Sequence, residues 1–275
     1  MRGLGALGLA TALLLPAPAS GAAPLTQDAA TTSTRVSALA GDLARYARTR
    51  SDTFSVGVYD ENGRHLIWYR PASAYDNASI VKVNILETVL WRAQEAHRWL
   101  TSWEQQQSAR MIRNSDNDAA TALWNHVGQS RGVAAYDHVI GLRDTTFDDG
   151  GAWGLTRSVV RDQIVLLRAV GAGAGPLASR ARSYVRTQMA NVESDQRWGV
   201  SAGVPAGSTV ELKNGWLPRS THGWRINSIG HIRSGSRHYE LVFLSTDNAS
   251  MSYGVATAQG VSRIVYRDLG ASVPG

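Results

Sequence analysis

The most informative absence in the sequence is cysteine, which does not occur among the 275 residues. Disulfide bonds and cysteine-based zinc sites are therefore excluded, and a lipoprotein anchor has no residue to attach to. A domain of about 250 residues does not need such cross-links, because it buries enough apolar surface to fold on its core alone. The composition, 43% hydrophobic and 18% charged, is that of a globular protein and excludes wholesale disorder.

Long apolar runs are also missing, apart from one near the start between Leu4 and Leu15. This run is too short for a permanent membrane span, but with Arg2 before it and small residues after it, it is typical of an export signal. A disordered or membrane-tethering N-terminus is the alternative. We expect cleavage after Ala19 or Ala23 and a secreted protein, extracellular or cell-wall associated, with no stable membrane anchor. The predicted segments are a signal peptide over 1–23 and a flexible leader over 24–33.

Lysine is nearly absent, because only Lys82 and Lys213 occur among the 28 basic residues. Arginine cannot replace lysine where an amine must lose its proton or act as a compact point charge. The two lysines are therefore candidates for chemistry. The net charge of +6 would favour binding to anionic cell-wall polymers or membrane surfaces. The alternative is that the arginines are ordinary surface residues of a soluble protein. No basic run with interleaved aromatic residues indicates nucleic-acid binding.

Hydrophobic spacing predicts strands near both ends of the chain and helices between them. The helix that Ser79 opens is apolar on most of its faces, so we expect it to be buried. The predicted elements are a helix over 34–49, strands over 53–59 and 64–69, the helix from 79, helices over 116–126, 158–169 and 178–191, strands over 209–212, 224–232 and 238–244, and a helix over 253–269.

This order of elements predicts an α+β fold with three layers, α/β/α. One antiparallel sheet is built from both chain ends, and an all-helical part is inserted between its halves. We expect one catalytic domain over 34–275, with a sheet part over 34–78 and 205–275 and a helical part over 79–204. We expect it to be a monomer.

The first chemical motif is Ser79-Ile80-Val81-Lys82. On a helix, positions i and i+3 share a face, so the hydroxyl and the amine can meet. A lysine whose pKa burial has lowered can act as the base that activates a serine. The first turn of a helix also offers unpaired N–H groups for a developing oxyanion. The alternative is a helix-capping Ser79 and a surface Lys82, which the apolar surroundings oppose.

Two further motifs follow in the chain. Ser115-Asp116-Asn117 precedes a predicted helix, where it is either a helix cap or a proton relay with an amide for substrate binding. Lys213-Asn214-Gly215 ends a predicted strand, where it is either the entry to a turn or a carboxylate-binding site. The glycine would let an extended substrate approach the strand edge.

Together, in this order, the three motifs resemble the signature of class A β-lactamases and penicillin-binding proteins, Ser-x-x-Lys, Ser-Asp-Asn and Lys-Thr-Gly. The element order also resembles that β-lactamase/DD-peptidase fold. The resemblance implies that Ser79 is the nucleophile, Lys82 its base and Ser115 a proton relay. It implies substrate binding by these residues: Asn117, Lys213, Asn214, Gly215, and Trp216, whose backbone N–H joins that of Ser79 in an oxyanion hole. Arg225, or alternatively Arg219, would help Lys213 hold a carboxylate.

Two departures from the family pattern affect the predicted chemistry. Asn214 stands where the family usually has threonine or serine, which changes the expected substrate contact. Class A enzymes also carry a loop glutamate that holds the deacylating water, whereas the corresponding stretch 145–157 contains none. Asp148 or Asp149 could substitute, or the pair could form a turn before two glycines. We therefore expect acylation to survive and deacylation of β-lactams to be slow.

Two other patterns carry no chemistry in our interpretation. Gly128-Gln129-Ser130-Arg131-Gly132 matches the nucleophile elbow of α/β-hydrolases, but no strand is predicted before it, so we expect a helix end and a turn. The seven histidines show no metal-ligand spacing, so we expect no metal and no cofactor.

The sequence therefore predicts an exported serine hydrolase or acyltransferase that forms an acyl-Ser79 intermediate. Its expected partners are β-lactams, or peptidoglycan-type substrates such as D-alanyl peptides and related esters or amides. A penicillin- or cell-wall-binding protein without turnover, on the same fold, is the alternative.

Overall fold

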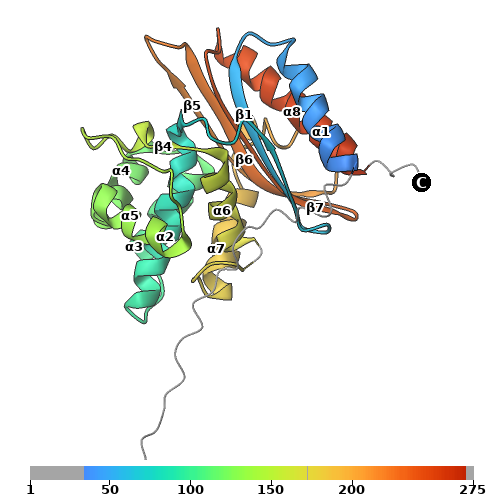
Figure 1. Cartoon of the computed structure of the whole chain (residues 1–275). Helices are drawn as coiled ribbons and strands as arrows, with labels where there is room; N and C mark the ends of the chain where they lie inside the picture. Colours follow the sequence, from blue (N-terminus) through green and yellow to red (C-terminus); the bar gives the residue numbers. More distant parts are fainter. Residues whose placement is uncertain (1–33, 172, 271–275) are drawn as a thin grey trace, which may run out of the picture.

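A five-stranded antiparallel sheet runs through the computed structural model, which describes residues 34–171 and 173–270 (Figure 1). The predicted signal peptide and leader lie outside the described residues. The strands are ordered β2-β1-β7-β6-β5, so strands from the start of the chain pair with strands from its end, as predicted. The strand bounds are β1 Thr53–Asp60, β2 His65–Tyr69, β5 Thr209–Pro218, β6 Trp224–Ser234 and β7 Arg237–Thr246.

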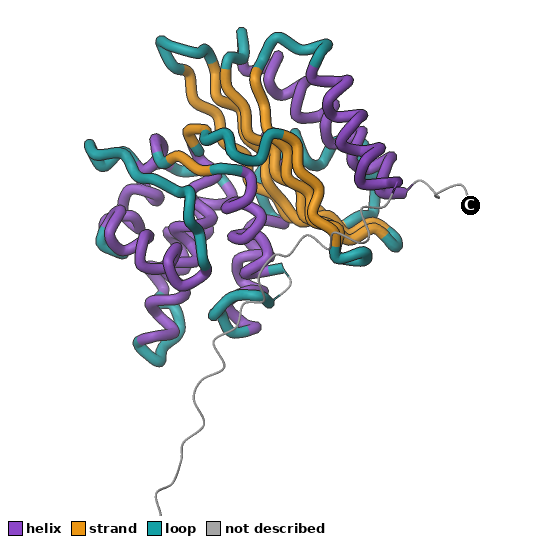
Figure 2. The backbone as a smooth tube through the Cα atoms, in the orientation of Figure 1, coloured by secondary structure: helices purple, strands orange, loops and turns teal. Residues whose placement is uncertain are grey.

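Helices cover both faces of this sheet, which confirms the predicted three layers (Figures 1 and 2). On one face α1 packs against α8, and α8 lies on β6 and β7. The inserted block occupies the other face, where α6 packs on β1 and β7 and α7 packs on β5. None of the described helices is long and apolar enough to cross a membrane. The helix bounds are α1 Thr34–Ala47, α2 Val81–Glu95, α3 Ser102–Arg113, α4 Asn117–His126, α5 Gln129–Ile140, α6 Val160–Val170, α7 Ser179–Ala190 and α8 Met251–Gly270.

The structure departs from the predicted elements at several places, and helices α3 and α5 have no counterpart among the helices predicted one by one. Ser79 lies in a short 3-10 turn, η2 (Ala78–Ile80), and not at the start of the α-helix. Strand β5 continues past Leu212 because all of it pairs with β6, from Thr209 opposite Arg233 to Pro218 opposite Trp224. A two-stranded sheet of β3 (Tyr75–Asp76) and β4 (Arg157–Ser158) was not predicted, since two-residue strands leave no hydrophobic pattern. The other 3-10 turns are η3 Trp153–Leu155 and η4 Ser194–Gln196.

Helix α2 is buried almost throughout, as its apolar faces predicted. Val81, Val83, Ile85 and Leu86 have no exposed surface, and neither has Lys82. The helix therefore runs through the centre of the inserted block and carries an ionisable side chain, that of Lys82, into the interior.

The stretch that resembles a nucleophile elbow joins two helices. Helix α4 ends at His126, Gly128 adopts a left-handed conformation with φ +84°, and α5 begins at Gln129. The element directly before Ser130 is a helix and not the strand that the elbow motif needs, and the predicted helix end is confirmed; the predicted turn is short, because α5 already begins at Gln129.

Helices α3 and α4 form a hairpin that is fixed at both ends. At its open end the buried Glu104 accepts hydrogen bonds from Arg98 at 2.7 and 2.8 Å, and its carboxylate also contacts His126, at 3.0 Å. Glu104 also forms a capping box with Thr101 at the start of α3. At the closed end Asp116 accepts from Arg110 of α3 and from the backbone N–H of Ala119 in α4. This turn carries Ser115.

The capping box makes a testable contribution to stability. Thr101→Ala removes the acceptor for the Glu104 N–H, so we expect the free energy of unfolding to fall by about 1 kcal/mol in urea denaturation. Ser102→Ala, at the next position, should change it by less than about 0.5 kcal/mol. Equal effects of the two substitutions would contradict the role of the cap.

Candidate active site

Both lysines of the chain reach the same serine. Lys82 extends from α2 and Lys213 from β5, and Ser115 lies in the turn between α3 and α4. The Lys82 Nζ atom is 3.2 Å from Ser115 Oγ, and the Lys213 Nζ atom is 3.0 Å from the same oxygen. Lys82 also donates to the Ser115 carbonyl at 2.6 Å and to Asn117 Oδ1 at 2.8 Å. Residues far apart in sequence are thus joined in one polar group.

Burial controls the charge of Lys82. The residue has no exposed surface, and among the described residues no carboxylate lies within salt-bridge distance of it. Removal from water disfavours the ammonium form, so burial lowers the pKa of Lys82 from 10.5 to about 7, against a smaller opposite effect of the Asp116 charge. Lys82 can therefore exist as a neutral amine near neutral pH, which a general base requires.

Lys213 is in a similar position. It is also fully buried, and its Nζ donates to its neighbour's carbonyl, Asn214 O, at 3.0 Å. Burial lowers its pKa well below the usual value, and the nearby charge of Lys82 lowers it further. Two like charges around one hydroxyl oppose each other, so protonation of one amine disfavours protonation of the other.

The backbone at Ser115 is held in a conformation that few non-glycine residues adopt. Its φ angle is +55°, in the left-handed region. This conformation lets both the carbonyl and the hydroxyl of Ser115 accept from Lys82. Such backbone strain, of order 1–3 kcal/mol, persists only where the surrounding contacts enforce it, and it is common at functional sites.

Ser79 lies at the start of the helical segment that leads to Lys82. Ala78 before it has φ +49°, which turns the chain from β3 into η2. The i, i+3 spacing places Ser79 and Lys82 on one side of this segment, but among the described residues no hydrogen bond joins their side chains. Lys82 donates to Ser115 and Asn117 instead. Catalytic contacts are often looser before substrate binds, so this geometry is compatible with a role as base.

Gly215 gives β5 a close approach to Ser79. A Cβ atom on Gly215 would lie 2.8 Å from the Ser79 backbone nitrogen and 3.0 Å from that of Ile80. Any side chain here would therefore press on the backbone N–H groups of Ser79 and Ile80. Trp216 follows on the same strand, which is at the edge of the sheet. The structure thus brings Gly215 and Trp216 to the segment around Ser79.

Asn214, one of the predicted substrate contacts, has other partners in the structure. The Asn214 side chain is buried and donates to the carbonyls of Gln196 and Trp198, at 2.7 and 3.1 Å. Successive residues of a strand point to opposite faces, so Asn214 points away from the face of Lys213. The substitution of an amide for the usual hydroxyl therefore serves the packing of the segment around Trp198 and does not bring Asn214 to Ser115.

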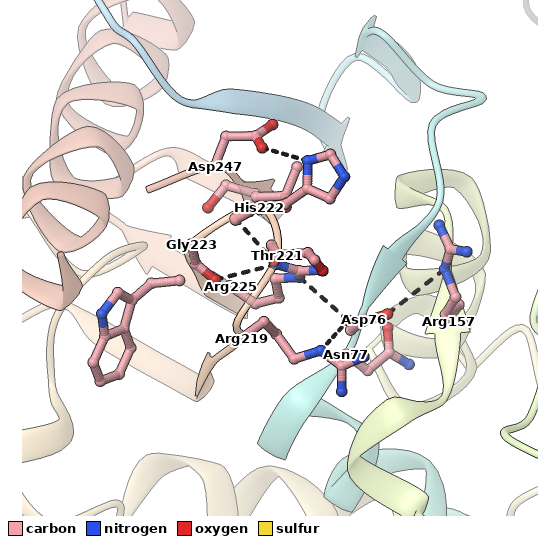
Figure 3. A network of polar contacts seen from close by, with 12 residues as sticks. Asp76, Asn77, Arg157, Arg219, Thr221, His222, Gly223, Arg225 and Asp247 are labelled. Carbon is pink, nitrogen blue, oxygen red and sulfur yellow. Dashed lines mark hydrogen bonds and ion pairs between the residues drawn. The ribbon is translucent and has the colours of Figure 1, made fainter. Parts of the chain in front are cut away.

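Arg225 belongs to a cluster around Asp76, which sequence patterns did not indicate (Figure 3). Its Nε donates to Asp76 at 3.2 Å, and its Nη1 donates to the carbonyls at the end of the β5–β6 turn. Arg219 and Arg157 also face Asp76, at 3.8 and 3.6 Å. Three guanidinium groups thus surround one carboxylate three residues before Ser79, which leaves this region positively charged.

The loop 145–157 presents an aromatic ring to Lys82. Trp153, in η3, has its ring centroid 4.9 Å from the Lys82 Nζ atom, and its indole N–H donates to Thr121. Asp148 accepts from the backbone N–H of Ala152 within the loop, and Asp149 is exposed. Among the described contacts, neither aspartate reaches Lys82 or Ser79. This arrangement matches the turn that we gave as the alternative for the aspartate pair.

The comparison with known proteins gives one family. The model of the beta-lactamase enzyme family matches residues 104–269, which is more than half of the chain. No curated protein matches the sequence.

Solved structures with the same fold have little sequence in common with this chain. A class A beta-lactamase from Bacteroides cellulosilyticus DSM 14838 superimposes with a TM-score of 0.77 at 16% identity, covering 87% of this chain and 100% of that one. TLA-1 extended-spectrum beta-lactamase has a TM-score of 0.78 at 13% identity, covering 86% and 100%. A mutant of PBP-A, as an acyl-enzyme complex with penicillin G, has a TM-score of 0.71 at 16% identity, covering 84% and 96%. These likenesses show the fold.

The charge state of the two lysines can be measured directly. With ¹³C at lysine Cε, the protein gives only two side-chain signals, because it has two lysines. We expect the signal that Lys82→Arg removes to titrate with a pKa of about 7. Lys213→Arg assigns the other signal, which should also titrate below the usual range. Titration of both signals near 10.5 would contradict the buried, desolvated site.

Proposed function

The chain belongs to the beta-lactamase enzyme family, and we propose that it is an exported serine hydrolase or acyltransferase that forms an acyl-Ser79 intermediate. The proposed substrates are β-lactams, D-alanyl peptides and related esters or amides, bound by a monomer. The observation that carries the proposal is the convergence of both lysine amines on Ser115, at 3.2 and 3.0 Å, beside the segment of Ser79.

In the acylation step, neutral Lys82 takes the proton of the Ser79 hydroxyl while Oγ attacks the substrate carbonyl carbon. The negative charge that develops on the carbonyl oxygen is held by the backbone N–H groups of Ser79 and Trp216. The C–N bond then breaks, and the leaving nitrogen takes the proton of Ser115. Lys82 returns a proton to Ser115 through the hydrogen bond between them. The acyl group stays on Ser79 Oγ.

The charges around the proposed site favour an anionic substrate. Lys213 lies on the same strand as Gly215, where an extended substrate would approach β5, and in its protonated form it would attract a substrate carboxylate; Ser115 links it to the reacting centre. Asn117 is exposed at the start of α4, and since its Oδ1 accepts from Lys82, its NH₂ group is the part that would donate to a substrate amide carbonyl. Arg157 and Arg219 add positive charge near Asp76. A carboxylate on the substrate would therefore be attracted to this side of the site.

A second candidate function is penicillin or cell-wall binding without turnover, and one observation favours it. In the loop 145–157, the ring of Trp153 lies against the Lys82 amine, and the Asp148 carboxylate accepts a hydrogen bond from the backbone of the loop itself. Because neither loop aspartate contacts Lys82 or Ser79 within the described residues, we expect no activated water at the acyl group and therefore its slow release. The two candidate functions differ in the lifetime of the adduct.

Acylation is tested by intact-mass measurement during incubation with benzylpenicillin. We expect one penicillin per protein, and no adduct on Ser79→Ala. Ser130→Ala, which removes the serine of the elbow-like motif, is the matched control and should label like the unsubstituted protein. Equal labelling of Ser79→Ala would contradict the proposal. An adduct that persists indicates binding without turnover, and one that decays indicates a β-lactamase.

Lys82 gives a separate prediction, because its neutral form must accept the Ser79 proton. Since burial lowers its pKa to about 7, we expect the acylation rate to fall about tenfold per pH unit below that value. Lys82→Arg should slow acylation by at least about 100-fold, because guanidinium does not act as a base. A rate that is constant between about pH 5 and pH 8, or a fast Lys82→Arg variant, would show that another group is the base.

A further inference from the structure

A group of possible metal ligands lies on the sheet away from the lysine pair. His231 of β6 stands opposite Glu240 of β7 in the register of the two strands. Glu61 lies in the turn directly after β1, and its backbone N–H donates to the carbonyl of His238 in β7. One ligand atom from each of Glu61, His231 and Glu240 lies within 4.8 Å of the others.

Two of these side chains are buried without hydrogen bonds. His231 is 1% exposed and Glu240 has no exposed surface. Within residues 34–171 and 173–270, both ring nitrogens of His231 and both carboxylate oxygens of Glu240 have no hydrogen-bond partner. The shortest contact between the two groups, from Nδ1 to Oε1, is 3.6 Å. Buried polar groups without partners are costly, so this pair requires a bound species or a charged state.

The neighbouring charges are already paired with one another. Glu211 stands opposite His231 on β5 and accepts two hydrogen bonds from Arg186 of α7, at 2.8 and 2.9 Å. Arg233 lies 3.4 Å from Glu61 and 3.9 Å from Glu211. No described lysine or arginine lies within 4.0 Å of Glu240. Arginine side chains therefore lie beside Glu61 and Glu211, but no described arginine lies beside Glu240, the most buried of these carboxylates.

The end of helix α6 closes over the pair. Gly171, which follows the last residue of α6, is so close that a Cβ atom on it would lie 2.6 Å from His231 Cε1 and 2.8 Å from Glu240 Oε1. Only glycine fits here without displacing the two side chains. The C-terminal end of a helix carries partial negative charge, which favours a cation next to it.

We propose that Glu61, His231 and Glu240 bind one divalent transition-metal ion, with Zn²⁺ as the preferred ion. A histidine nitrogen and two carboxylate oxygens are a ligand set that Zn²⁺ accepts, and two carboxylates balance its charge. Ligands of a tetrahedral zinc at about 2.0–2.1 Å lie about 3.3 Å apart, close to the 3.6 Å between His231 and Glu240. The ion would tie the turn after β1 to strands β6 and β7 and would stabilise the fold.

The test uses the full exported domain after treatment with a chelator. We expect calorimetry with ZnCl₂ to give one site per chain, and thermal unfolding to shift to higher temperature with Zn²⁺. Co²⁺ in place of Zn²⁺ should give visible absorption bands of a four- or five-coordinate ion. Glu61→Gln and His231→Gln should each weaken Zn²⁺ binding at least tenfold.

Matched controls separate this site from surface binding. His138→Gln removes an exposed histidine of α5 and should bind Zn²⁺ like the unsubstituted protein. Should His231→Gln fail to fold by near-ultraviolet circular dichroism, Glu61→Gln, at a half-buried position, still decides the question. The proposal is overturned if neither Zn²⁺ nor Co²⁺ binds, or if Glu61→Gln and His138→Gln bind equally well. The first of these results would indicate a charged His231–Glu240 pair.

Discussion

The site depends on the burial of two amines around one hydroxyl. Lys82 and Lys213 both reach Ser115, and within the described residues neither has a carboxylate at salt-bridge distance. Burial without a counter-ion lowers both pKa values, so the fold itself supplies the neutral amine that the proposed chemistry needs. Helix α2, the α3–α4 hairpin and strand β5 must all be in place for this contact to form. The left-handed φ of Ser115 is a strained backbone conformation, so the contact with the two lysines forms at a cost in the local stability of the α3–α4 hairpin.

The segment before Ser79 is linked directly to the loop 145–157. Tyr75 and Asp76 pair with Ser158 and Arg157, and the Asn77 N–H donates to the Thr156 carbonyl at 2.7 Å. On the other side, Asn227 of β6 donates to the carbonyl of Asn77 at 3.0 Å. The segment of Ser79 and the loop that presents Trp153 are therefore held as one unit. In the account proposed here, acylation depends on the lysines, and the fate of the acyl group depends on this loop.

The sequence was sufficient to predict the three layers, the pairing of strands from both chain ends and the burial of α2, because hydrophobic spacing and motif order carry that information. It also indicated Lys82, Ser115 and Lys213, which the fold brings together. It did not indicate that Asn214 faces the segment around Trp198 or that Arg225 joins the Asp76 cluster, since both depend on tertiary contacts. The Trp153 contact and the group of Glu61, His231 and Glu240 likewise come from segments far apart in the chain, with no local pattern.

The central claim is that Ser79 is the residue that carries the acyl group, between β5 and the lysine pair. A crystal structure of the protein soaked with a penicillin tests it most directly. The account predicts continuous density from Ser79 Oγ to the opened β-lactam, with the ester carbonyl oxygen within hydrogen-bond distance of the Ser79 and Trp216 N–H groups. An acyl group on another residue, or an intact β-lactam in the site with Ser79 unmodified, would contradict it.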